Sequence, residues 1–218
     1  LTLARFGLSV WQGERVFGLH AWLSIFIGGL RVDIATLSYI IMPALLLTLL
    51  MQSVGWQNKV RGLIKIYLVT MSALLVFFEV ITPTFINEYD LRPNRLFIEY
   101  LIYPKEVSKM IFSGYKLEVF IAVIALILSC KFASKIFSNQ WQSKSSLTGL
   151  NQSILALVLV CLTIFGARNS LGHRPLNPAM VSFSTDHLLN DLTLNSLYSV
   201  AFAVKQLSNE QSSQDYYG

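Results

Sequence analysis

Four long apolar stretches occupy most of the first three quarters of this chain. Residues 34–54 and 147–167 contain no charged residue in 21 positions each. Residues 66–86 contain only Glu79, and residues 117–137 carry their three charges toward the ends of the stretch. A helix needs roughly 20 apolar residues to cross the hydrocarbon core of a bilayer. Each stretch is long enough, so the sequence predicts four membrane spans.

The bilayer also dictates the fold class. Only helices and closed barrels satisfy their own backbone polar groups in lipid, and unbroken stretches of this length are typical of helices. We therefore predict an all-α, polytopic transmembrane helical bundle with an extracytoplasmic helical linker. Charged residues make up only 13% of the chain, against about 25% in an average soluble domain.

The charge balance points to a lipid partner. The net charge of +5 suits contact with anionic head groups, so membrane phospholipid is the expected partner. The soluble segments contain no cluster of basic and aromatic residues of the kind that nucleic-acid-binding domains carry. We therefore expect no nucleic acid to bind.

The chain divides into three parts. Residues 1–30 are either a truncated first span or an interfacial helix, or else the first turns of the next span. The transmembrane domain covers 31–167, with an outer loop at 87–115 and spans near 31–54, 63–86, 116–137 and 147–167. The extracytoplasmic linker covers 168–218.

Basic residues orient these parts, because cytoplasmic loops collect lysine and arginine. The loops around Lys59 and Lys135 contain basic residues and no acidic residue. We therefore orient these two loops toward the cytoplasm. The outer loop and the C-terminal tail are expected on the other side.

Three charged residues within or beside the spans are candidates for function, because a charge at the centre of a span costs roughly 2.5–3.5 kcal/mol. Arg31 and Asp33 lie at the predicted start of the first complete span, and Glu79 lies one to two turns before the end of the next. Arg31 could pair with Glu79 if the apolar residues before it, Trp22 to Leu30, already belong to the helix. Two interpretations remain open: a binding site for a lipid phosphate, and an interhelical salt bridge that fixes the helices.

The outer loop carries a second set of candidates. Arg92 and Arg95 offer planar guanidinium groups that match phosphate oxygens, and Asn94 and Glu99 lie beside them. The loop is either a cradle for a lipid head group or an interfacial helix whose arginines extend toward water. On the first interpretation, the head-group site comprises Arg31, Asp33, Glu79, Arg92, Asn94, Arg95 and Glu99.

The tail begins with a turn-rich stretch in which His173 and Arg174 are expected to help dock the linker. Ser184 or Thr185 is then predicted to cap a helix, and apolar residues recur at helical spacing over residues 185–207. The last eight residues show no periodicity and read as a linker or a frayed end.

His187 and Asp191 lie four residues apart, so they could face one metal ion from a helix. A catalytic zinc site has three protein ligands, and the sequence supplies no third one nearby. We therefore expect no metal site in this chain.

Three local strings resemble one family of enzymes. They are Gly-Leu-Arg-Val-Asp (29–33), the run Tyr-Asp-Leu-Arg-Pro-Asn-Arg-Leu-Phe-Ile-Glu-Tyr-Leu (89–101) followed by Tyr-Pro-Lys-Glu-Val (103–107), and Leu-Gly-His-Arg-Pro-Leu-Asn-Pro (171–178) with Phe183 and Asn-Ser-Leu-Tyr-Ser (195–199). Together they resemble the membrane part of the lipoteichoic acid synthase-like phosphoglycerol transferases of the sulfatase and alkaline phosphatase superfamily. The match is better to the Gram-negative relatives than to the Gram-positive polymerases.

The resemblance implies a specific arrangement. Such enzymes have membrane spans, an outward linker and a large extracytoplasmic catalytic domain with a threonine nucleophile and a divalent metal. No position here matches that nucleophile or those ligands, so no catalytic residue is expected in this chain. Manganese or magnesium, and the catalytic chemistry, are expected only in a C-terminal catalytic domain beyond Gly218.

The function implied is that of the membrane anchor and lipid-presenting domain of a phosphoglycerol-type or phosphoethanolamine transferase. It would act on phospholipid at the outer face of the bacterial cytoplasmic (inner) membrane, as a multi-pass protein with an extracytoplasmic tail. The alternative is a non-enzymatic polytopic membrane protein that binds lipid or assembles with partner helices.

Overall fold

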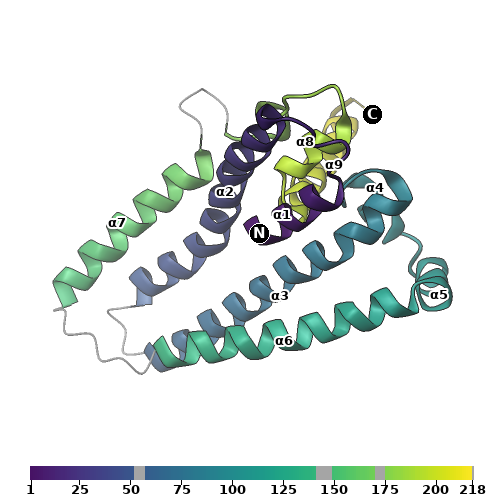
Figure 1. Cartoon of the computed structure of the whole chain (residues 1–218). Helices are drawn as coiled ribbons and strands as arrows, with labels where there is room; N and C mark the ends of the chain where they lie inside the picture. Colours follow the sequence, from purple (N-terminus) through teal and green to yellow (C-terminus); the bar gives the residue numbers. More distant parts are fainter. Residues whose placement is uncertain (52–56, 141–148, 170–174, 218) are drawn as a thin grey trace. The chain divides into compact units, whose positions relative to one another are not determined.

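The structure is a computed structural model that describes residues 1–51, 57–140, 149–169 and 175–217. All regular structure in these residues is helical, which confirms the predicted all-α class. A short 3-10 turn, Pro178–Met180, precedes the last two helices. The α-helices, labelled as in Figure 1, are α1 (Thr2–Trp11), α2 (Leu19–Met51), α3 (Gln57–Tyr89), α4 (Arg95–Tyr100), α5 (Pro104–Gly114), α6 (Lys116–Gln140), α7 (Gly149–Arg168), α8 (His187–Thr193) and α9 (Ser196–Tyr217).

Three of these helices are long and apolar enough to cross a membrane. The candidate spans are His20–Thr48 in α2, Val60–Tyr89 in α3 and Lys116–Ser138 in α6. Helix α7 contributes a shorter apolar stretch, Ser153–Arg168, where the fourth span was predicted. The chain is therefore a helical protein whose candidate spans coincide with three of the four predicted apolar stretches.

The helix of the first span begins earlier than residue 31, where the sequence predicted its start. Helix α2 starts at Leu19, directly after Gly18, whose positive φ of 114° ends the preceding turn. Residues 19–30 are therefore the first turns of the span, which was one of the alternatives for the N-terminal part. Only α1 forms a separate helix there.

The predicted outer loop is largely helical. Helix α3 continues to Tyr89, and α4 and α5 occupy most of the segment before α6. Asp90 then reverses the chain with a positive φ of 56°, which a short polar side chain tolerates better than most.

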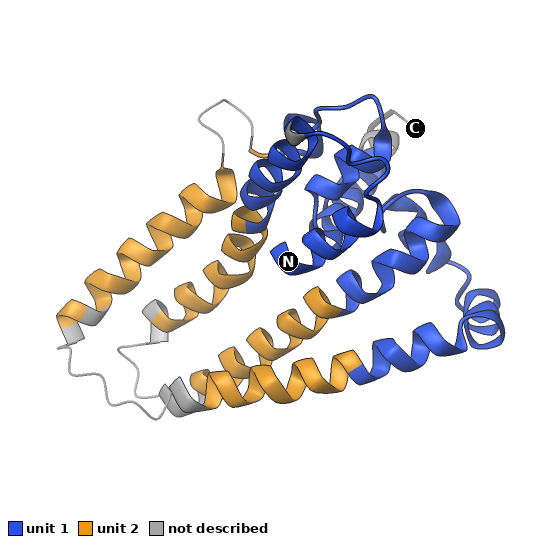
Figure 2. Ribbon diagram, viewed as in Figure 1, with its two compact units in different colours: residues 1–33, 77–124, 177–218 blue, residues 34–76, 125–176 orange. Residues whose placement is uncertain are grey.

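The described chain separates into two compact units (Figure 2). Unit 1 comprises Leu1–Asp33, Phe77–Ile124 and Asn177–Gly218, and unit 2 comprises Ile34–Val76 and Ala125–Leu176. Unit 1 thus collects the N-terminal helix, the segment between α3 and α6, and both tail helices.

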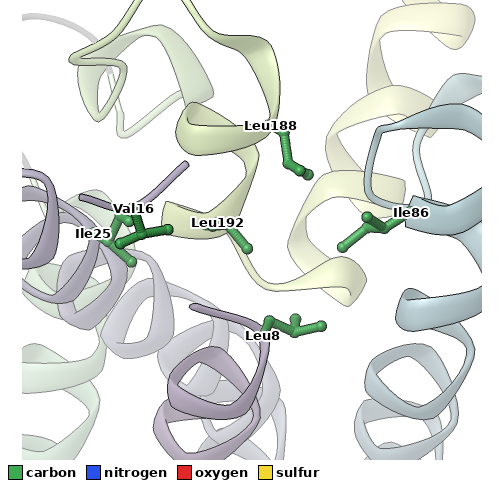
Figure 3. Packing of buried hydrophobic residues seen from close by; sticks show 6 residues of the cluster. All are labelled: Leu8, Val16, Ile25, Ile86, Leu188 and Leu192. Atoms are coloured by element: carbon green, nitrogen blue, oxygen red, sulfur yellow. The ribbon is translucent and has the colours of Figure 1, made fainter. Parts of the chain in front are cut away.

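Unit 1 is organised around a small apolar core. The side chains of six buried residues from α1, the α1–α2 turn, α2, α3 and α8 form this core (Figure 3), and they are Leu8, Val16, Ile25, Ile86, Leu188 and Leu192. Burying one such side chain stabilises a fold by roughly 1.5–3 kcal/mol. The tail is therefore an integral part of unit 1 and not a detached linker.

Unit 2 has a core of its own, formed by Ala44, Val60 and Ile64. Polar contacts supplement it: the Tyr67 hydroxyl donates to the carbonyl of Ile40 at 2.9 Å, one turn before Pro43. Gly166 of α7 lies so close to Ser38 of α2 that a side chain there would overlap the serine hydroxyl. Such close contact through small residues is typical of helices packed in lipid.

Candidate functional site at the junction of α8 and α9

Two buried ion pairs meet at the segment that joins α8 to α9. The first joins Arg5 of α1 to Asp33 of α2, with the Arg5 side chain 1% exposed and that of Asp33 6% exposed. Arg5 Nη1 donates to Asp33 Oδ2 at 2.7 Å, and Nη2 donates to Oδ1 at 2.8 Å. This is a two-pronged arginine–carboxylate contact, the strongest geometry for such a pair.

The first pair also holds the backbone of the tail. Arg5 Nε donates to the carbonyl of Leu192 at 3.2 Å, and Nη2 reaches the carbonyl of Thr193 at 3.4 Å. Asn195 Nδ2 donates to Asp33 Oδ1 at 3.2 Å. Every nitrogen of the Arg5 guanidinium has an acceptor, so the buried charge is fully compensated.

A glycine makes room for the first pair. The Arg5 guanidinium lies against Gly29 of α2, and a Cβ at that position would overlap its Nε and Cζ atoms. Glycine is unfavourable inside a helix by roughly 1 kcal/mol relative to alanine. Its use here lets the arginine pass close to the α2 backbone and reach Asp33 one turn further on.

The second pair joins Glu79 of α3 to Arg92. Arg92 Nη1 lies 3.2 Å from both carboxylate oxygens of Glu79 and donates to Ser196 Oγ at 3.1 Å. The backbone N–H of Ser196 donates to Glu79 Oε1 at 3.1 Å. The hydroxyls of Ser196 and Thr82 lie 2.6 Å apart and share a hydrogen bond. Charge, hydroxyl and backbone groups from α3, the α3–α4 turn and α9 thus form one network.

Pro83 favours this arrangement locally. A proline inside a helix has no N–H to donate to the carbonyl four residues earlier, which in α3 is the carbonyl of Glu79. The α3 backbone is thereby loosened at the turn from which the Glu79 side chain extends toward α9.

The Arg92 side chain is fully buried but only partly satisfied. Within the described residues, its Nε and Nη2 atoms have no hydrogen-bond partner. These two nitrogens form the side edge of the guanidinium, which is a fork suited to two oxygens of one phosphate or carboxylate. Three N–H donors of Arg92, one on Nε and two on Nη2, are therefore without an acceptor among the described residues.

Asp191 completes the surroundings of Arg92. Its Oδ2 accepts a hydrogen bond from the Arg92 backbone N–H at 3.1 Å. Burial raises the pKa of Asp191, although the Arg92 N–H and the Arg92 charge both act in the opposite direction. The carboxylate therefore lies in an environment that disfavours its ionised form.

The junction itself is buried throughout. Leu192, Thr193, Asn195 and Ser196 are at most 1% exposed, and Leu194 is 5% exposed. Asn195 Oδ1 accepts from the Tyr198 N–H at 2.9 Å, which is the pattern of an N-cap. Asn195 thus caps α9 with its oxygen while its nitrogen contacts Asp33. Both ion pairs converge on these few residues.

The structure separates the residues predicted for the head-group site. Asp33, Glu79 and Arg92 belong to the buried network. The proposed Arg31–Glu79 pair is wrong, because Glu79 accepts from Arg92 and Ser196 instead. Arg31 lies half-buried on α2, two residues before Asp33.

The other predicted residues lie apart from the buried network. Asn94 caps α4 by accepting from the Leu96 N–H at 3.0 Å. Arg95 is exposed and pairs with Glu99 within α4 and with Glu210 of α9. His173 and Arg174, predicted for linker docking, lie outside the described residues.

Two details of the tail differ from the prediction. The cap of α8 is Asp186, which accepts from the Leu188 N–H, and not Ser184 or Thr185. Ser184 instead accepts from the Asp186 N–H, so it precedes the cap. Helix α9 continues to Tyr217, where a linker or a frayed end was predicted.

Several residues of the site were not predicted from the sequence as members of it: Arg5, Asp191, Asn195 and Ser196. Arg5 carried a signal, because it is a lone arginine in an apolar segment. Asn195 and Ser196 stood within one of the strings that carried the family resemblance. Their partners are 162 and 117 positions away in the chain, which no local pattern reveals.

The described residues contain no group of three or more His, Cys, Asp or Glu side chains placed to hold a metal ion. His187 and Asp191 therefore have no third ligand of these types within that part of the chain.

No family model matches the chain, and no solved structure matches it.

Proposed function

We propose that this chain is the membrane anchor and lipid-presenting domain of a phosphoglycerol-type or phosphoethanolamine transferase. The observation that carries the proposal is the clamped junction of α8 and α9. Two buried ion pairs, one from α1 and α2 and one from α3 and the turn after it, hold this segment. Any domain that follows α9 is thereby fixed to the ends of two candidate spans.

A fixed attachment is useful to an enzyme whose substrate is confined to the bilayer. Holding a catalytic site close to the membrane surface raises the effective concentration of lipid head groups around it. A flexible linker would lose part of this gain. Ion pairs suit the task, because breaking one partner of a buried pair costs about 3–5 kcal/mol.

The second support for the proposal is the position of the family strings. Gly29 and Asp33 come from the first string, Arg92 from the second, and Asn195 and Ser196 from the third. All five lie in or against the buried network. Residues that identify the resemblance thus also build the site, which is expected if the family shares this junction.

The lipid-presenting role rests on Arg92. Its unpartnered Nε and Nη2 edge has the geometry of a phosphate-binding fork, and phosphate is common to the head groups of all the candidate donors. Because this edge is buried, a head group would reach it only after the side chains around it move apart. On this proposal, the unit 1 ends of α2 and α3 face the outer side of the inner membrane. The divalent metal and the threonine nucleophile would belong to the domain that follows.

Two measurements test the proposal. The coding sequence beyond Gly218 should encode a domain with clustered metal ligands. Membranes that contain the protein as naturally encoded should then transfer the label from phosphatidylglycerol or phosphatidylethanolamine carrying a labelled head group.

Variants connect this activity to the junction. Asn195→Ala removes the α9 cap and the contact with Asp33, and it should lower turnover. Arg15→Met, which breaks an exposed pair with Asp90, should leave turnover unchanged. If neither lipid loses its head group, the transferase proposal fails and the alternative of a non-enzymatic lipid-binding or helix-assembling membrane protein stands.

A further inference from the structure

Helix α5 has no buried residue, although it lies between two candidate spans. It follows α4 after a run of three consecutive apolar residues, Leu101, Ile102 and Tyr103, each more than half exposed. Three such side chains in sequence are unusual on a surface that faces only water. We therefore expect these three side chains to be covered by an environment that is itself partly apolar.

The position of α5 along the chain limits what that environment is. The candidate span in α6 begins at Lys116, two residues after α5 ends at Gly114. Two residues reach at most about 7 Å even when fully extended. The C-terminal end of α5 is therefore held within that distance of the start of a span.

One face of α5 combines charge with an aromatic ring. Lys105, Lys109 and Phe112 occupy positions i, i+4 and i+7, which lie on one face of a helix. Both lysines are exposed, and Phe112 is 65% exposed. Neither lysine forms an ion pair with any residue that the structure describes. The opposite face contains Val107 and Ile111, which are half-buried, and Met110, which is 43% exposed.

This pattern suits a helix that lies in the plane of a membrane surface. Lysines near an anionic surface are attracted to lipid phosphates, and aromatic rings are enriched at the head-group boundary. Lys116 adds a third positive charge just beyond the helix. Glu106 lies in the first turn of α5, where a negative charge stabilises the helix dipole, about 100° around the helix from Lys105.

We propose that α5 is an interfacial helix that seats the α4–α5 segment on a bilayer containing anionic phospholipid, with Lys105, Lys109 and Phe112 as its contact face. The proposal needs only that α6 crosses a membrane, so it stands apart from the transferase proposal. It assigns to α5 a lipid surface, distinct from the buried network around Arg92.

A fluorescent label on the contact face tests the proposal in nanodiscs. The label is attached to Ser108→Cys in a background with Cys130→Ala and Cys161→Ala, because Ser108 lies one turn before Phe112 on the same face. Nanodiscs of phosphatidylcholine alone are compared with an equal mixture of phosphatidylcholine and phosphatidylglycerol. Lipids with a nitroxide in the head-group region should quench the label in the mixture and much less in phosphatidylcholine alone. A label on Met110→Cys, an exposed position on the side of the helix away from Lys105 and Phe112, should be quenched less.

The charge dependence is measured with a matched pair of double variants. Each lysine near an anionic surface contributes about fivefold to the docking equilibrium, so Lys105→Gln with Lys109→Gln should lower the ratio of docked to undocked helix about 30-fold. Lys105→Arg with Lys109→Arg keeps the charge and should retain the quenching. Equal quenching in both nanodisc types, or protection of the label by protein without any quenching by lipid, would overturn the proposal.

Discussion

The exchange of Asp33 for Asn isolates the electrostatic part of the junction. The asparagine keeps the size of the side chain, but it replaces one carboxylate oxygen by an amide group that can only donate. Arg5 would then face that group with a charge that is 1% exposed and has lost its counter-ion. Removing one partner of a buried pair costs about 3–5 kcal/mol. Since domains are stable by about 5–15 kcal/mol, this is a large fraction of the total.

The free energy of unfolding can be measured by titrating the protein in mild detergent micelles with a denaturing detergent. Fluorescence is a suitable signal, because Trp22 packs against Phe6 of α1 and Phe26 of α2. Asp90→Asn is the matched control: Arg15 contacts Asp90 with equally short distances of 2.7 and 2.8 Å, but both side chains are exposed. Exposed pairs contribute little, so this variant should unfold like the wild type.

A second control separates loss of charge from loss of shape. The double variant Arg5→Met with Asp33→Leu removes both charges, and replacing a whole buried pair by apolar side chains is often neutral or stabilising. It should recover most of the stability that Asp33→Asn loses. If Asp33→Asn unfolds at the same detergent fraction as Asp90→Asn, the Arg5–Asp33 pair does not hold the junction and the reasoning is wrong.

Three further predictions concern single positions in the same region. Gly29→Ala should destabilise the protein by about 1–3 kcal/mol, as overpacking does, although alanine in an ordinary helix position is stabilising. When Arg5 is already replaced by Met, the same exchange should cause no further loss of stability relative to Arg5→Met alone in the same titration. Ser196→Ala should cost about 1–3 kcal/mol, because Thr82 and Arg92 lose their shared partner, and a silent variant in thermal unfolding would contradict this. Asp191 has a raised pKa in the folded protein, so its contribution to stability is complete below its ordinary value of about 3.8 and falls as the pH rises through the raised value. Asp191→Asn should therefore gain stability relative to the wild type as the pH increases from about 4, and a difference that does not change with pH would refute the assignment.

The sequence was sufficient for the fold class because the dominant signal is local. Charge depletion over about 20 residues is decided by neighbouring positions, and the spans in α2, α3 and α6 followed from it. The start of α2 was harder to place, because the apolar residues before Arg31 continue without a break into the predicted span. The start of α2 is set by the positive φ of Gly18, which the sequence alone does not reveal.

The site could be predicted only in part. Glu79 was predicted because a charge within a span is costly, and Arg92 because its guanidinium group matches phosphate oxygens, but neither signal identifies the partner of the residue. Arg31, Arg92 and Arg95 were equal candidates in the sequence, and only the fold shows that Arg92 is buried beside Glu79 while Arg95 is exposed. The tail helices were expected from their periodicity, whereas their burial against α1 depends on contacts across nearly the whole chain.

The contact between Arg5 and the carbonyl of Leu192 has a consequence for synthesis of the protein. The two residues are 187 positions apart, which corresponds to roughly 10–40 s of translation at about 5–20 residues per second. Asp33 is synthesised soon after Arg5, but throughout most of that interval the carbonyl acceptors at Leu192 and Thr193 do not yet exist. Ribosomes stalled before and after residue 192 should therefore yield nascent chains with different resistance to protease at α1.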